Sequence, residues 1–306
     1  MTESSEDRKF ERVVHKIDPQ SKLLRAWELK GGVSAQVTAL ETVRPDGQTQ
    51  KMIVRQYGEV DFKHNPRIAA NEFRLLQQLR SAGLAVPAPY YLDQSGEIFS
   101  TPYVVIEYIE GQPELAPSSF PDYILQFATH LSRIHQVDCS KLDVSFLPQQ
   151  EKKYAEKLRK RPGHVDEAGD ERRIRDVLEA VWPLVQRNRD VLLHGDFWPG
   201  NTLWKDGQLV AIIDWEEAAL VYPLSDIAGS RLELLWAFGI DAMQSFTRQY
   251  QAINVIDFTN LPYWDLCAAL RLSQFATWAT DDLDEKTMRE KRKWFMAQAF
   301  EKLSMQ

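Results

Sequence analysis

The side chains best suited to chemistry gather in one stretch of the chain, Leu192 to Glu216. Apolar runs on either side of Lys205-Asp206-Gly207-Gln208 predict a β-hairpin, whose outer ends must meet. Asn201 enters the first strand and Asp214 leaves the second, so we expect both beside the loop that carries Asp196. Oxygen ligands without Cys or His suit a hard cation such as Mg²⁺, which is usually shared with substrate phosphates. The stretch therefore predicts a phosphoryl-transfer centre.

The elements that must position these side chains change in kind along the sequence. Short β-branched segments predict strands over residues 24–29, 33–43, 52–57 and 103–107, and residues 66–82 have helical spacing. After residue 110 the spacing is mostly helical, over 122–137, from Ser225 to Gly239, over 262–279 and over 284–303. We therefore expect an α+β chain with domains at residues 1–109 and 110–306. Residues 1 to about 22 are polar and should form a frayed lead-in helix or arm.

One carboxylate lies where its helix should be buried. Glu72 falls inside the apolar stripe formed by Ile68, Leu75 and Leu79. A carboxylate on a buried face needs a cation or several hydrogen-bond donors. Arg55, in the third predicted strand, can supply that cation.

The pattern His194-Gly195-Asp196, Asn201 and Ile213-Asp214-Trp215-Glu216 resembles the aminoglycoside phosphotransferase and choline kinase-like families, small-molecule relatives of the protein kinases. Gly195 stands in place of the kinase Arg, and Trp215-Glu216 in place of Phe-Gly. The resemblance covers roughly residues 25 to 240. It implies a two-lobed protein kinase-like fold, with an N-terminal antiparallel sheet plus helix and a mostly helical C-terminal lobe.

The resemblance also implies roles for individual residues. Asp196 would accept the proton, or orient the hydroxyl, of the acceptor, while Asn201 and Asp214 would hold Mg²⁺ on the nucleotide phosphates. The resemblance implies that His194 and Asp226 support this loop. It implies that Trp198 and Glu216 lie on the acceptor side. His135, which recurs at its place in family members, is better explained as a packing histidine than as a ligand.

Nucleotide binding is implied for a second set of residues. Gly31, Gly32 and Ser34 would lie in the loop that covers the phosphates. Arg55 takes the place of the kinase lysine that pairs with the helix glutamate, here Glu72, and a guanidinium forks over two oxygens where an ammonium offers a point charge. The implied hinge residues, whose backbone groups would bind the purine of ATP or GTP, are Glu107, Tyr108 and Ile109.

Composition narrows the classes of protein. The chain has 306 residues, 44% of them hydrophobic, and a formal net charge of −7. That charge argues against nucleic-acid binding. The start of the chain lacks the apolar core of a signal peptide, and no apolar run is long enough to span a bilayer. Cys139 and Cys267 are too few for a disulfide framework. We expect a cytoplasmic protein with no membrane and no obligatory protein partner.

Several alternatives remain open at the level of sequence. The acceptor is a small hydroxylated molecule; an amine-bearing aminoglycoside, an amino alcohol such as choline and an amino acid such as homoserine all fit. A catalytically silent, kinase-shaped module is favoured by Arg55 in place of Lys and disfavoured by intact Asp196, Asn201 and Asp214. A protein kinase is disfavoured because no Ala-Pro-Glu follows Asp214.

Overall fold

The computed structural model describes residues 5–29, 35–148, 150–159, 171–271 and 285–305. The chain divides into two compact units. Unit 1 comprises Met1–Glu110 together with Ala211–Glu216, and unit 2 comprises Gly111–Val210 together with Glu217–Gln306. The chain therefore crosses between the units three times, twice within the stretch that carries the oxygen-bearing residues.

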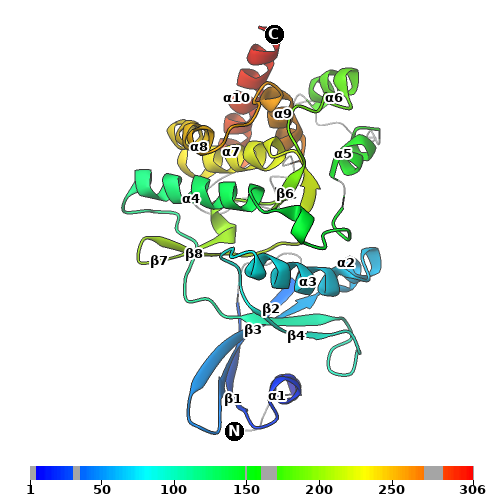
Figure 1. The fold of residues 1–306 in the computed structure, drawn as a ribbon, viewed down its shortest axis with the longest axis vertical. Coiled ribbons are helices and arrows are strands. Elements are labelled where there is room, and N and C mark those ends of the chain that lie inside the picture. The colour runs from blue at the N-terminus through cyan, green and yellow to red at the C-terminus, as the bar shows by residue number, and fades with distance from the viewer. Residues whose placement is uncertain (1–4, 30–34, 149, 160–170, 272–284, 306) are drawn as a thin grey trace. The chain divides into compact units, whose positions relative to one another are not determined.

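Unit 1 is built on a five-stranded antiparallel sheet of order β1-β2-β3-β5-β4. Its elements are α1 (Ser5–Ile17), β1 (Lys22–Glu28), β2 (Ala35–Val43), β3 (Thr49–Tyr57), α2 (Glu59–His64), α3 (Ile68–Ser81), β4 (Pro89–Asp93) and β5 (Tyr103–Glu107) (Figure 1). The predicted antiparallel sheet with its helix is confirmed.

The two faces of this sheet bury different side chains because strand residues alternate between faces. Met52 and Val54 of β3 join the apolar cluster that receives Phe10 and Val13 of α1. Arg55 lies on the opposite face, toward the buried stripe of α3. Residues Ser5–Ile17 thus form the predicted lead-in helix, but this helix is packed on the sheet and the prediction that it is frayed is wrong.

Unit 2 is mostly helical, as predicted. Its helices are α4 (Phe120–His135), α5 (Gln150–Arg159), α6 (Glu171–Val181), α7 (Leu224–Phe238), α8 (Ile240–Ile253), α9 (Leu261–Arg271) and α10 (Glu285–Ser304). Helix α7 is apolar on most of its surface and is buried against α8, α9 and α10. Two of the charged residues of α7, Asp226 and Arg231, are buried as well and must be paired.

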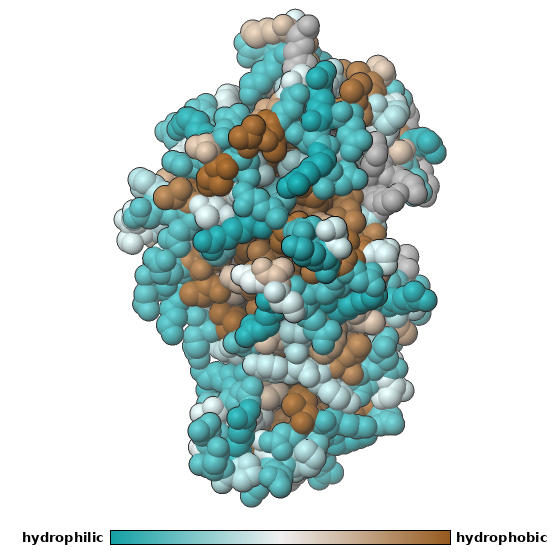
Figure 2. Space-filling model, viewed as in Figure 1, coloured by the Kyte–Doolittle hydropathy of each residue, from teal (hydrophilic) through white to brown (hydrophobic). Residues whose placement is uncertain are grey.

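Short strands frame the stretch that the sequence singled out. β6 (Val191–Leu193) pairs with β9 (Ala219–Val221), and β7 (Thr202–Lys205) pairs with β8 (Gln208–Ile212). Asp206 and Gly207, both at positive φ, make the two-residue turn between β7 and β8. The face drawn in Figure 2 is largely hydrophilic, with apolar patches between. Among the described helices, none is both long and apolar enough to cross a membrane.

Candidate functional site

The backbone of the 194–201 loop is anchored on α7 by Asp226. The amides of His194 and Gly195 donate to Oδ2 and Oδ1 of this buried carboxylate, at 2.8 and 2.9 Å. His135 Nε2 lies 3.2 Å from Asp226 Oδ2, and the His135 ring is held in turn by Tyr250 Oη at 2.7 Å. Burial alone would raise the pKa of Asp226, but the hydrogen bond and charge of His135 lower it. The carboxylate stays ionised and fixes both amides.

The backbone of the loop requires a glycine at position 195. Its φ is +85°, and a Cβ there would come within 2.1 Å of the carbonyl oxygen of Glu217. The kinase arginine that Gly195 replaces could not adopt this backbone path. The left-handed turn lets the chain leave β6 and present Asp196 immediately afterwards.

We expect Gly195→Ala to destabilise the protein by about 3 kcal/mol, since left-handed backbone strain adds to a clash with a backbone atom that cannot move aside. Activity should fall with it. Urea unfolding checks the size of the effect, and Gly207→Ala is the matched control: Gly207 has φ +74°, but a Cβ there meets nothing within 4 Å. Equal losses in the two variants would show that crowding by Glu217 is unimportant.

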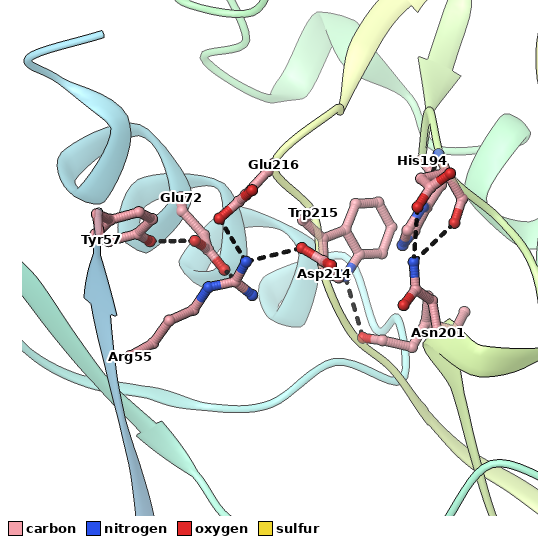
Figure 3. Close-up of polar contacts among 10 residues, drawn as sticks. Arg55, Tyr57, Glu72, His194, Asn201, Asp214, Trp215 and Glu216 are labelled. Carbon is pink, nitrogen blue, oxygen red and sulfur yellow. Dashed lines mark hydrogen bonds and ion pairs between the residues drawn. The ribbon is translucent and has the colours of Figure 1, made fainter. Parts of the chain in front are cut away.

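Asp196 and Asn201 face each other across the loop. The Asn201 amide nitrogen donates to the carbonyl oxygen of Asp196 at 3.0 Å and to its Oδ2 at 3.2 Å (Figure 3). Asn201 Oδ1 makes no hydrogen bond to any described residue and is free to accept a ligand. His194 is fully buried and its Nδ1 accepts from the Asp196 amide. Trp198 lies over Gly200, where a Cβ would strike its ring.

Two residues that the sequence did not single out complete this part of unit 2. Arg271, the last residue of α9, donates from Nη1 to the carbonyl of Gly195 at 2.5 Å, and its Nη2 lies 3.7 Å from Asp196 Oδ1. Burial and the charge of Asp196 raise the pKa of half-buried Glu233 to about 8, with Arg271 opposing. Glu233 follows Asp226 by seven positions on α7, so both lie on one helix face, a signal the sequence did offer. Arg271 lies in another helix, and no sequence pattern indicated that it would approach this loop.

Replacing Arg271 with Lys should lower kcat about tenfold or more while leaving the KM for nucleotide within about twofold. Lysine keeps the charge but cannot reach the Gly195 carbonyl and the Asp196 carboxylate together, so the loop and the Asp196 side chain lose their common anchor. Steady-state kinetics checks this. The control is Arg289→Lys, because Arg289 pairs with Glu285 one turn away in α10 and both side chains are 44% exposed. A wild-type kcat in Arg271→Lys would contradict the anchoring role.

Glu233 should make stability depend on pH. Its folded-state pKa of about 8 lies above the unfolded value near 4.5. The folded protein therefore keeps a proton that the unfolded chain releases, and stability falls as pH rises from about 4.5 to about 8. We expect Glu233→Gln to flatten this slope, measured by urea unfolding at pH 5, 6.5 and 8. Glu290→Gln, an exposed change, should leave the slope as in the wild type.

In unit 1, the guanidinium of Arg55 contacts three carboxylates (Figure 3). Arg55 Nη2 donates to Asp214 Oδ1 at 2.8 Å and to Glu216 Oε1 at 2.5 Å, and Nη1 lies 3.4 Å from Glu72 Oε1. Tyr57 donates its hydroxyl proton to Glu72 Oε2. The pair of Arg55 with Glu72 was predicted; its contacts with Asp214 and Glu216 were not. Asp214 has φ +64°, a conformation that Asp tolerates better than most residues.

The charges of this group do not balance. Three carboxylates face one guanidinium, and burial raises the pKa of Glu72, with Arg55 and Tyr57 only partly opposing. Burial would lower the pKa of Arg55, but Glu72, Asp214 and Glu216 together raise it well above its usual value. The guanidinium stays charged, and negative charge remains in excess around Asp214 and Glu216.

The other residues predicted to bind nucleotide are those of the hinge and of the phosphate-covering loop. The amide of Glu107 donates to the carbonyl of Ala88 at 2.8 Å, and its carboxylate accepts from Arg80 and from the Ala88 amide. Both groups of Glu107 are thus engaged within unit 1. Tyr108 and Ile109, half-buried, follow directly after β5. The positions predicted for the phosphate-covering loop, Gly31, Gly32 and Ser34, lie outside the described residues.

Comparison with family models decides the classification. Residues 28–270 match the model described as "Phosphotransferase enzyme family". The chain belongs to this family. The match spans both units and includes all the loop and carboxylate residues described above, so the resemblance carried by the 194–216 stretch is confirmed for the chain as a whole.

Curated relatives of this phosphotransferase are longer proteins. Mouse acyl-CoA dehydrogenase family member 10 is 26% identical over 194 residues, which is 58% of this chain and 18% of the relative. Rat acyl-CoA dehydrogenase family member 11 is 23% identical over 240 residues, 67% of this chain and 30% of the relative. The chain thus spans less than a third of the length of either.

Solved structures show the same fold. The GDP and kanamycin complex of APH(2″)-IIIa has a TM-score of 0.64 at 16% identity, covering 97% of both chains. Macrolide 2′-phosphotransferase MphH from Brachybacterium faecium has a TM-score of 0.63 at 17% identity, covering 94% of this chain and 96% of its own. The predicted kinase-like fold is therefore confirmed. Sequence identities this low do not identify the substrate.

Proposed function

We propose that this phosphotransferase moves the γ-phosphoryl group of ATP or GTP to a hydroxyl of a small molecule. The observation that supports this most strongly is the setting of Asp196. Its side chain is 35% exposed, so an acceptor can reach it, while the peptide that carries it is held by Asp226 and Arg271. A base that is accessible and yet fixed is what phosphoryl transfer by positioning requires.

In this mechanism Asp196 accepts a hydrogen bond from the acceptor hydroxyl and takes its proton as the oxygen attacks the γ-phosphorus. Asn201 directs one Asp196 oxygen by donating to it, and Arg271 approaches the other. The carboxylate therefore has a defined orientation before substrate arrives. His194, buried and bonded to the Asp196 amide, supports the loop and does not itself meet substrate.

The donor set fits a divalent cation. Asn201 Oδ1 has no hydrogen bond within the described part of the chain, and the excess carboxylates Asp214 and Glu216 supply hard, anionic oxygens. Those described residues contain no cluster of three His, Cys, Asp or Glu that alone could hold a metal. We propose that Asn201 and Asp214 hold Mg²⁺ jointly with nucleotide oxygens. Bound there, Mg²⁺ would neutralise charge on the β- and γ-phosphates.

We propose that Arg55 binds phosphate oxygens, with Glu72 retaining it. The Arg55 guanidinium donates to Asp214 and Glu216, so phosphates would share or replace these partners. Gly31, Gly32 and Ser34 remain proposals for the loop over the phosphates, and the backbone of Tyr108 and Ile109 for the purine. The engaged amide of Glu107 makes its contribution the weakest of the three hinge residues.

The acceptor side is proposed to include Trp198 and Glu216. One structural neighbour was solved with kanamycin and another is named as a macrolide phosphotransferase. An amine-bearing, hydroxylated small molecule is our first proposal for this chain, with choline- and homoserine-type metabolites as the alternative.

The test is turnover by the purified chain with Mg²⁺ and ATP or GTP over a panel that includes kanamycin, choline and homoserine. We expect one acceptor class to stimulate nucleotide consumption and to yield a phosphorylated product by mass spectrometry. If no acceptor is phosphorylated and neither nucleotide binds, the proposal fails. Binding of nucleotide that is independent of metal and unchanged in Asn201→Ala would instead support a silent nucleotide-binding module.

A further inference from the structure

A cavity outside the candidate functional site lies in unit 2, among α8, α9 and α10. Its volume is about 740 Å³, within the usual range of small-molecule sites. The residues that line it come from α7 to α10 and from Phe258, Thr259 and Met305, and the 194–201 loop contributes none of them. The proposed function makes no use of this cavity.

A rigid, buried ion pair borders the cavity. Arg231 of α7 is 2% exposed and binds the fully buried Asp265 of α9 through Nε at 3.0 Å and Nη2 at 3.1 Å. Its Nη1 donates to Thr247 Oγ1 at 2.6 Å. Because Asp265 cancels the charge of Arg231, this part of the wall is close to neutral and holds its shape.

Two further cations line the cavity with no such partner. Arg248 of α8 and Lys302 of α10 make no hydrogen bond or ion pair to any other residue in the described ranges. Partial burial and the charge of Arg231 lower the pKa of Lys302, and the carboxylates of Asp265 and Glu301 oppose this shift. Arg248 and Lys302 are both exposed where they line the cavity. Among the described lining residues none is acidic, although the chain carries a net charge of −7. An anion bound in the cavity would pair with these cations.

The rest of the wall is apolar. Met243, Phe258 and Trp294 line the cavity, joined by Leu261, Pro262 and Met305. Trp294 is 37% exposed, so part of its side chain is accessible to a ligand in the cavity. Cations beside an aromatic and aliphatic wall suit a molecule with a charged head and a hydrocarbon body.

We propose that this cavity binds a small amphipathic anion, a molecule that carries a carboxylate or phosphate group on an apolar body. The head group pairs with Arg248 and Lys302, and the body lies against Phe258 and Trp294. The Arg231–Asp265 pair gives the cavity its fixed base. This site is separate from the proposed phosphoryl-transfer site and does not depend on turnover.

Isothermal titration calorimetry with octanoate and octyl phosphate tests the proposal, with octanamide and inorganic phosphate as single-feature probes. We expect both anions to bind saturably at one site, and each single-feature probe at least about tenfold more weakly. Arg248→Gln with Lys302→Gln should weaken binding about tenfold or more, since two charge-assisted contacts are lost. Lys286→Gln with Lys293→Gln removes the same charge from exposed positions of α10 and should change nothing.

Gln244→Trp provides a second variant that keeps every charge and fills the cavity from α8. It should also abolish binding, and its thermal unfolding midpoint shows whether the fold is retained. Binding of octanamide as tight as octanoate, or of inorganic phosphate as tight as octyl phosphate, would overturn the amphipathic assignment. Equal affinities in the two double variants, or no saturable binding of either anion, would overturn the site.

Discussion

Asp196→Asn should lower kcat by about 10²- to 10⁴-fold, the usual contribution of a positioned general base. Asparagine has nearly the same shape and can still meet the amide of Asn201, but it cannot take a proton from the acceptor. Because the nucleotide is proposed to bind through other residues, its dissociation constant should stay within about threefold of the wild-type value. Stopped-time product assays and calorimetric nucleotide titration measure the two quantities separately.

The matched control is Asp206→Asn. Asp206 occupies the exposed turn between β7 and β8 at φ +51°, where Asn fits as well as Asp. It removes the same charge without touching the loop, so its kcat should equal that of the wild type. An Asp196→Asn variant with full activity would remove Asp196 from the mechanism. A joint loss of turnover and nucleotide binding would indicate that its role is in binding.

Asp226→Asn should lower the free energy of unfolding by about 2–4 kcal/mol. The carboxylate accepts from the amides of His194 and Gly195 and lies beside His135. Asparagine offers one oxygen, so a buried amide is left facing an NH₂ group, and each unmet buried donor costs about 1–3 kcal/mol. Urea unfolding gives the size of the loss, and faster hydrogen exchange at the Gly195 amide would locate it.

Turnover should fall in the same variant because the peptide before Asp196 loses its anchor. Asp241→Asn, an exposed change in the first turn of α8, is the control and should be neutral. The pKa of Asp226 is lowered in the fold, so its stabilising effect is present above the unfolded pKa near 3.8 and is lost as pH falls through the folded value. If Asp226→Asn unfolds like the wild type, the loop is held by other contacts.

Some structural features could be predicted because residues nearby in the sequence determine them. Glu72 interrupts an apolar helical stripe, which by itself demands a cation, and Arg55 supplies it. Alternation in β3 and the turn at Asp206-Gly207 likewise follow from short-range geometry. The fold class could therefore be predicted from the sequence.

Other features depend on contacts between residues far apart in the sequence, which local patterns do not predict. Arg271 meets Gly195 only because α9 packs on α7, and nothing near residue 271 indicates this. Helix α1 contains mostly polar residues, and its short apolar stripe, including Phe10 and Val13, is recognisable as core only beside the sheet. The engaged amide of Glu107 reflects its pairing with the segment before β4, which the hinge pattern does not encode.

The most direct test of the phosphotransferase proposal transfers label without assuming an acceptor. The purified chain is incubated with Mg²⁺, [γ-³²P]ATP or [γ-³²P]GTP and a protein-free extract of small metabolites, in parallel with Asp196→Asn. We expect label to appear in a small organic molecule with the wild-type chain and to be reduced at least about a hundredfold with the variant. Label transfer that is equal in the two samples, or absent from both while nucleotide remains unbound, would contradict the proposed function.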